Sequence, residues 1–456
     1  MTIKFRVFNG QSRRVLFNAC GLIWLCSLEH IAFPDLFHYN NLLIGPRAMG
    51  LGGAFTAISN DTSGLFYNPG GLAFQSSAEL STSINTYYLK NNKYENVFGD
   101  KEFEESARGT VSTFFGFSKI ISPPILGQLH VGIAFVNPDA ALSDENVLIE
   151  NEPAPSVIRY HRTANIRSGR SQVIAGVAKR FGKQTGLGCA GSYLDVDELE
   201  QTYQDVVQGP FTFKELPDTS VYSTLGQNLR THLVLRGGSV KCGFRSSLNG
   251  GLLIGASYQK TEMVFQKLEQ DLEINKVFTD LNNQVIEVTN TSNPNLKGQL
   301  LRSVSRSSDE RFLTSWPDEL RVGIAYQPSN SFLVSADVMR HGDGDGTITQ
   351  VKKSEVINYA LGAEIIVANS FFLRSGFFTN RDATATRDIS SPNQRKEYLD
   401  YKGASLATGL KLRSGEYAIH YTEQRGSGMA EKVSGKVEAS TGRLQVISIS
   451  ASQSFQ

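Results

Sequence analysis

A strict alternation of apolar and small or polar residues constrains the fold of this chain most strongly. Segments 319–327 and 356–366 carry apolar side chains at every second position, the spacing that puts them on one face of a β-strand. The apolar positions are Leu320, Val322, Ile324 and Tyr326 in the first segment and Ile357, Tyr359, Leu361, Ala363 and Ile365 in the second. From about residue 77 onward, similar segments follow one another, separated by polar turns. This rhythm fits either a β-sandwich or a β-barrel.

The N-terminus favours export from the cytoplasm. Four basic residues among the first fourteen precede a short apolar run at 15–28, which Glu29 ends. This order is typical of a signal peptide, and a buried N-terminal helix is the alternative. No later run approaches the ~20 apolar residues of a membrane-spanning helix, whereas a spanning β-strand hides half of its positions as polar.

The C-terminal strand favours a barrel over a sandwich. Residues 443–455 place Ile447, Ile449, Ala451 and Phe455 at alternate positions, with serines between them. An apolar, aromatic-ended last strand resembles the signal that outer-membrane barrels present to their assembly machinery. Strand rhythm alone permits about twelve to sixteen strands, a normal range for such barrels.

Composition and motifs exclude several function classes. A net charge of +1 argues against nucleic-acid binding, which needs a basic surface. The glycine loop at 50–57 lacks the strand, helix and lysine of a phosphate site. The segment 341–346 hints at a calcium loop but fits a solvated hairpin tip better. Neither a metal-ligand spacing nor a nucleophile elbow occurs, so we expect no metal, no cofactor and no enzyme activity.

Two cysteines, Cys189 and Cys242, remain once the signal peptide is removed. Each shares a strand face with apolar neighbours, so we interpret both as small hydrophobic residues rather than as a disulfide.

Residues 45–75 form a glycine-punctuated segment before the first strand. Glycines let backbone approach backbone closely, and Asn68-Pro69-Gly70-Gly71 is a strong turn signal. The segment is too short to make its own core, so it must lie inside or against something larger.

This segment resembles the N-terminal plug, or hatch, of the long-chain fatty acid transporter (FadL) family of bacterial outer-membrane proteins. The matching residues are Gly45, Arg47-Ala48-Met49-Gly50, Gly52-Gly53-Ala54, Asp61 and Asn68-Pro69. The family usually has alanine after the Asn-Pro pair, where this chain has Gly70. Segments 316–338 and 359–380 also resemble the family, and the rest fits by strand rhythm only.

The resemblance implies an all-β fold: a transmembrane antiparallel β-barrel of about 14 strands with a small N-terminal plug inside the lumen. The expected organisation is a signal peptide at 1–30, the plug at 31–76 and the barrel with long extracellular loops at 77–456. The implied function is passive diffusion of hydrophobic compounds, notably long-chain fatty acids, across the outer membrane by a monomer. The alternative is a PorV-like barrel that docks or shuttles secreted partners. Expected partners are therefore apolar small molecules, outer-membrane lipids and the barrel-assembly machinery.

Two groups of residues are candidates for the site. The plug residues implied in gating are Gly52, Gly53, Asp61, Asn68, Pro69 and Gly70, which either shift after ligand binding or only fix a turn. A carboxylate head group would need fixed cations. Alternation puts Arg321 on the lumen face, and Arg374 is a second candidate. The alternative role for either arginine is a lumen salt bridge with Glu364 or Asp337.

Three longer stretches, 139–155, 195–219 and about 267–315, are too polar for lipid contact and are predicted as extracellular loops. Loosely spaced apolar residues in the last stretch allow an amphipathic helix that shields a groove or two strands that extend beyond the membrane. We favour the strands.

Overall fold

The computed structural model describes residues 37–98, 101–152, 157–213, 216–280, 300–348, 352–367, 370–385, 397–433 and 436–455, with 282, 284 and 395. The predicted signal peptide at 1–30 lies outside these residues. Short helices α2 (Pro46–Gly50), α3 (Gly64–Tyr67) and η1 (Pro69–Phe74) precede the first strand, and η2 (Asn249–Gly251) is a turn. Among the described residues, no helix has the length and apolar character needed to span a membrane.

Most of the other described residues lie in one antiparallel β-sheet. The strands are β1 (Ala78–Phe98), β2 (Lys101–Ile121), β3 (Leu129–Glu152), β4 (Val157–Phe181), β5 (Thr185–Phe213), β6 (Leu216–Ser247), β7 (Leu252–Thr279), β8 (Leu300–Glu310), β9 (Glu319–Ser329), β10 (Phe332–His341), β11 (Val356–Val367), β12 (Phe371–Asn380), β13 (Glu397–Lys411), β14 (Gly415–Val433) and β15 (Lys436–Phe455).

The sheet closes on itself as a barrel of fourteen strands. Of the 15 strands, β8 alone stands outside the ring, which β6–β7 and β1–β15 pairings close. Strand β7 pairs with β9 along residues 252–259 and with β8 along residues 267–277. The strands β8 and β9 therefore lie one after the other along the same edge of β7. The predicted closed barrel of about 14 strands is confirmed.

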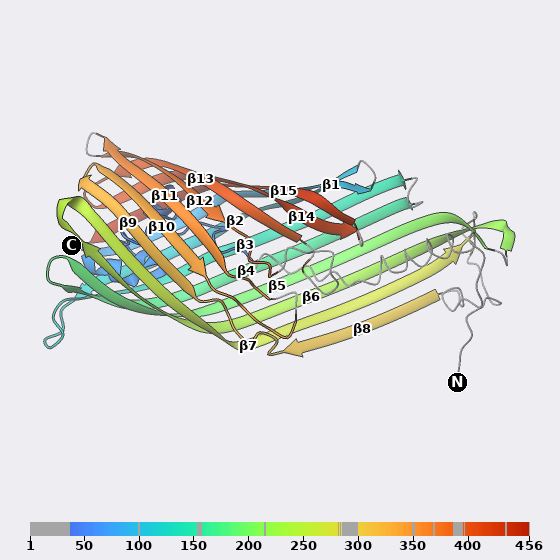
Figure 1. Cartoon of the computed structure of the whole chain (residues 1–456), viewed down its shortest axis with the longest axis horizontal. Helices are drawn as coiled ribbons and strands as arrows, with labels where there is room; N and C mark the ends of the chain where they lie inside the picture. Colours follow the sequence, from blue (N-terminus) through green and yellow to red (C-terminus); the bar gives the residue numbers. More distant parts are fainter. Residues whose placement is uncertain are drawn as a thin grey trace.

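The two ends of the barrel differ. Short turns at 122–128, 182–184, 248–251, 330–331 and 412–414 lie at the end where β15 finishes, which we call the turn end. We call the opposite end the loop end. Strands β9 to β12 have 10 to 12 residues, about the length that crosses a bilayer, whereas β5 and β6 have 29 and 32 and run far beyond them (Figure 1).

The prediction of loops at 139–155 and 195–219 is wrong for the described residues. Residues 139–152 belong to β3, 195–213 to β5 and 216–219 to β6. Outside the bilayer a sheet pairs its backbone without needing an apolar face, so polarity did not mark loops here. The favoured interpretation of 267–315 is correct, because 267–277 and 300–310 pair as two extended strands.

Side chains alternate between an apolar outer face and a packed lumen, as the sequence predicted. Val322, Ile324 and Tyr359 are about half exposed on the outside, whereas Arg321 and Glu364 are buried inside. Ile447 and Ile449 of the last strand also point outward. An oily exterior at every second position is the surface that a membrane-spanning barrel requires.

Cys189 and Cys242 form a disulfide on the outer face, so the prediction of two unlinked cysteines is wrong. The residues stand directly opposite each other on β5 and β6, with Cα atoms 4.1 Å apart. Their faces were predicted correctly. Their pairing depends on the register between β5 and β6 at two positions that are 53 residues apart in the sequence, and neither strand's own pattern reveals that register.

Candidate functional site

The plug fills the lumen near the turn end. Its apolar side chains make one buried cluster with inward residues of several strands, including Ile44, Phe55, Ile58, Leu65 and Leu72 from the plug. Ala134, Ile174 and Leu253 supply the barrel side of this cluster. The segment therefore gains its core from the barrel, as its length required.

A belt of inward-facing glycines on the barrel wall seats the plug. It comprises Gly116, Gly132, Gly176, Gly186, Gly188, Gly243, Gly255, Gly323, Gly362 and Gly376. Eight of them face one another in pairs across neighbouring strands: Gly132 with Gly176, Gly188 with Gly243, Gly255 with Gly323 and Gly362 with Gly376. A Cβ atom at Gly376 would overlap the Gly52 nitrogen. The wall lacks side chains where the plug backbone touches it.

Three inward-facing serines of the barrel wall donate hydrogen bonds to the plug. Ser335 donates to the Ala54 carbonyl at 2.8 Å, Ser257 to the Tyr67 carbonyl at 2.8 Å and Ser405 to the Gly50 carbonyl at 3.2 Å. These hydroxyls satisfy plug carbonyls that no strand or helix partner satisfies.

Asn68 links the plug to itself and to the wall. Its buried amide donates to the carbonyls of Thr56 and Phe244, each at 2.8 Å, and its side-chain oxygen accepts from the Gly70 nitrogen at 3.0 Å. Pro69 follows as the first residue of η1 and lies against Gly188. Gly70 leaves no room for a Cβ, which would lie 2.5 Å from the Gly243 carbonyl oxygen. The departure from the family's alanine therefore has a steric reason.

Replacing Asn68 by alanine is expected to loosen the plug by about 2–3 kcal/mol, because two buried carbonyls lose their donor. Hydrogen–deuterium exchange of residues 56–70 in the purified protein would rise by the corresponding factor. Asn330→Ala in the exposed β9–β10 turn is the matched control and should leave this exchange unchanged. Equal exchange in both variants would contradict the role assigned to Asn68.

The other predicted plug residues have distinct local roles. Gly52 and Gly53 have φ of +63° and +81°, a left-handed conformation that favours glycine. Asp61 accepts hydrogen bonds from the Ser63 nitrogen at 2.9 Å and hydroxyl at 2.5 Å. Burial raises the pKa of Asp61, while those hydrogen bonds and the charge of Arg47 oppose the rise.

One ion network ties the plug to the wall near the turn end. Glu364 bonds Arg47 of the plug at 2.7 Å and Arg374 of β12 at 2.6 Å. Arg374 also makes a two-pronged contact with Glu416, at 2.5 and 2.8 Å. Arg374 thus faces the lumen and pairs with Glu364, one of the partners proposed from the sequence.

A second network lies on the loop-end side of the plug. Glu319 accepts from Arg321 at 2.7 and 3.0 Å and from Lys241 at 2.8 Å, and it contacts His341 at 3.2 Å. Lys241 also donates to the Phe66 carbonyl at 2.5 Å. Arg321 pairs with Glu319 rather than with Glu364 or Asp337, the partners proposed from sequence. We call Lys241, Glu319, Arg321 and His341 the lumen floor.

The carboxylate of Asp337 instead accepts hydrogen bonds from the plug backbone. Its carboxylate accepts from the Phe55 nitrogen at 2.9 Å and the Thr56 nitrogen at 2.8 Å. The bonds fix the chain just after the two left-handed glycines.

Next to the lumen floor, inward side chains of β5, β6 and β7 pack with Phe37 and with residues near the ends of β8, β11 and β12 in one buried apolar cluster, which we call the lumen cluster. Its buried members are Phe37, Leu194, Val196, Leu233, Leu235, Leu268, Phe312, Leu313, Val356 and Ala383, with Tyr39, Met263, Trp316 and Ile348 packed against them. Lys353 lies 4.0 Å from the Trp316 ring centre, and Tyr39 stacks on His341 at 3.8 Å. A buried apolar cluster inside the barrel thus abuts the charged lumen floor.

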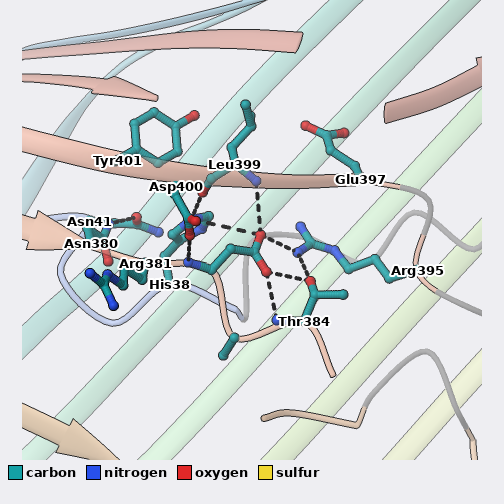
Figure 2. A network of polar contacts seen from close by, with 12 residues as sticks. His38, Asn41, Asn380, Arg381, Thr384, Arg395, Glu397, Leu399, Asp400 and Tyr401 are labelled. Atoms are coloured by element: carbon teal, nitrogen blue, oxygen red, sulfur yellow. Dashed lines mark hydrogen bonds and ion pairs between the residues drawn. The ribbon is translucent and has the colours of Figure 1, made fainter. Parts of the chain in front are cut away.

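Phe37 and Tyr39 pack in the lumen cluster, and His38 and Asn41 lie in a polar network with the ends of β12 and β13 (Figure 2). Asn380 accepts from the Tyr39 and Asn40 nitrogens at 3.2 and 3.0 Å, and His38 donates to the Leu399 carbonyl at 2.6 Å. Asp382 accepts from Arg395 at 2.8 Å and from the Leu399 nitrogen at 3.3 Å. The strand ends of β12 and β13 therefore hold the chain that leads into the plug.

Sequence reasoning missed the lumen floor apart from Arg321, and it missed the glycine belt. The belt had a signal, since a glycine recurs at an inward position of most strand segments. The lumen floor had no such signal, because Lys241 lies on β6 and Glu319 on β9, and only the pairing of strands in the sheet brings these two residues together. Among the described residues, no group of three or more His, Cys, Asp or Glu side chains could hold a metal ion.

The structure resembles solved FadL-type barrels. A Pseudomonas aeruginosa FadL homologue matches with a TM-score of 0.53 at 14% identity, covering 92% of this chain and 100% of its own. The toluene transporters TodX of Pseudomonas putida (0.57, 11%, 92% and 100%) and TbuX of Ralstonia pickettii (0.54, 12%, 92% and 100%) match similarly. No protein-family model and no curated protein sequence matches the chain. The resemblance to the FadL family is confirmed at the level of the fold.

Proposed function

We propose that this protein is a FadL-like outer-membrane transporter that passes hydrophobic compounds by passive diffusion through a plugged barrel. The observation that carries the proposal is the buried apolar cluster of inward side chains, the lumen cluster, beside the seated plug inside the barrel. Burying an apolar chain there would yield ~0.8 kcal/mol per methylene. A water-filled channel would offer no such gain.

Long-chain fatty acids are the substrates that we favour. Lys241 and Arg321 of the lumen floor lie on the lumen-cluster side of the plug, where a carboxylate head group would compete with Glu319 for two cations. Two structural neighbours are described as toluene transporters, which makes an uncharged aromatic hydrocarbon the competing substrate.

Orientation, gating and export complete the proposal. Barrels of this type have short periplasmic turns, so the turn end would face the periplasm and the loop end the exterior. Residues 1–30 would be removed as a signal peptide, and the plug at 31–76 would shift around Asn68 and Pro69 to open a path. The protein would act as a monomer, without cofactor or catalysis.

Binding of radiolabelled oleate and of toluene to the purified protein in detergent tests the proposal. We expect saturable oleate binding that Leu235→Asn weakens about tenfold, because a buried amide without partners is unfavourable. Val304→Asn, on the exposed part of β8, is the control and should bind as the wild type does. Binding of toluene without binding of oleate would replace fatty acids by aromatic hydrocarbons as the proposed substrate class. Binding of neither compound would contradict the proposed transport function.

A docking role is a second candidate, as for PorV-like proteins. Among the described strands, β8 pairs with β7 alone, so its other edge is available to a partner strand. Co-purification of a secreted protein, combined with no saturable binding of oleate or toluene, would favour this function.

A further inference from the structure

A group of basic side chains lies at the turn end, on the side of the plug away from the lumen cluster. Arg180 of β4 and Arg245 of β6 both stand opposite Gly186 of β5, so the three positions form one row on the inner wall. Because Gly186 has no side chain, Phe74 of the plug packs over it. The two guanidinium groups lie 4.8 and 4.1 Å from the centre of the Phe74 ring.

Arg245 is buried without a counter-charge. Only 6% of the residue is exposed, and its Nε and Nη1 atoms are buried without a hydrogen-bond partner among the described residues. Within that part of the chain, no carboxylate pairs with either arginine. Every other deeply buried arginine discussed above has at least one carboxylate partner. The ring contact offsets part of the desolvation, but a buried unpaired charge remains unfavourable.

His130 extends the group on the neighbouring strand. It is 3% exposed, its Nδ1 atom lacks a partner among the described residues, and it faces Ala178, two residues from Arg180. Glu79, the acidic residue of β1 at this end, already accepts from Gln75 and Ser81. Within the described residues, Nε and Nη1 of Arg245 and Nδ1 of His130 are therefore left without a hydrogen-bond partner.

We propose that Arg245, Arg180 and His130 form an oxyanion-binding site at the turn-end mouth of the barrel, which accepts a carboxylate or a phosphate group. Arg245 would donate from Nη2 together with either Nε or Nη1, the two fork arrangements of a guanidinium that suit either anion. Phe74 provides an apolar wall beside the head group. The site is separate from the lumen floor, because the plug lies between them, and it does not depend on the transport proposal.

Calorimetric titration of the full-length protein in non-ionic detergent tests this site, with inorganic phosphate, decanoate and decan-1-ol as probes. We expect phosphate and decanoate to bind, and Arg245→Gln to weaken both about tenfold through the loss of charge-assisted hydrogen bonds. Arg245→Lys should retain most of the phosphate affinity. Arg306→Gln, whose side chain is 80% exposed on β8, is the control and should leave both affinities unchanged.

Each outcome decides the proposal. Binding of phosphate that depends on Arg245 supports it even where oleate transport fails, and binding of decanoate alone assigns the site to the head group of an amphiphile. Heat-modifiable gel migration shows whether each variant is folded. If Arg245→Gln does not fold, Arg245→Lys, which retains the charge, tests the site in its place. Absence of binding by both anions, or affinities within twofold of wild type in Arg245→Gln, would overturn it.

Discussion

Replacing Gly188 by valine is expected to unseat the plug while the barrel still forms. A Cβ atom at this position would lie 2.5 Å from the carbonyl oxygen of Pro69 and 2.6 Å from its carbonyl carbon. Those atoms belong to backbone held between β5 and β6, so they have little room to shift. Overpacking of this kind typically destabilises by about 1–3 kcal/mol, and the valine methyl groups would add further contacts.

We expect this overlap to displace the plug rather than the barrel wall. It has only short helices, whereas the wall at Gly188 is hydrogen-bonded to strands on both sides. We therefore expect single-channel conductance in planar bilayers to rise several-fold, and trypsin to cleave the plug after Arg47. Heat-modifiable gel migration should still report a closed barrel.

Gly191→Val is the matched control on the same strand. Gly191 faces outward, and a Cβ atom there would have the Ser239 carbonyl oxygen as its nearest neighbour, 4.0 Å away. This variant should keep the wild-type conductance and protease pattern. Equal conductance in the two variants would mean that the glycine belt does not seat the plug.

Replacing Glu319 by glutamine is expected to destabilise the folded barrel by about 3–5 kcal/mol, because buried charges lose their only carboxylate in the lumen floor. Glutamine keeps the shape and one acceptor oxygen but no charge. Lys241 and Arg321, whose side chains are 5% and 2% exposed, would then stand side by side without compensation. The measurement is equilibrium unfolding in urea in the presence of lipid vesicles.

Glu355→Gln provides the comparison for this substitution. Glu355 pairs with Arg340 at 2.5 Å, but the two side chains are 39% and 42% exposed. Exposed pairs contribute about 0–1 kcal/mol, so the free energy of unfolding should barely change. Similar losses in the free energy of unfolding in both variants would show that burial does not increase the contribution of the ion pairs in the lumen floor. Oleate affinity should rise in Glu319→Gln if the freed cations receive the carboxylate.

The sequence by itself determined the strand rhythm and the face of each strand residue. Arg321, Gly323 and Ala325 point inward because side chains alternate along any strand, a property that needs no partner. The same local logic identified the plug segment, since glycines and Asn68-Pro69 specify backbone that must lie against other backbone.

Only the tertiary structure decided which strands meet and what fills the lumen. Cys189 faces Cys242, Lys241 reaches Glu319, and Gly188 lies under Pro69 because strand register brings distant segments together. Register is a relation between two strands, and a one-residue shift would change every such partner while leaving each strand's own pattern intact. The polar segments of β3 and β5 escaped prediction for a related reason: strands pair through their backbones, and that pairing requires no apolar face.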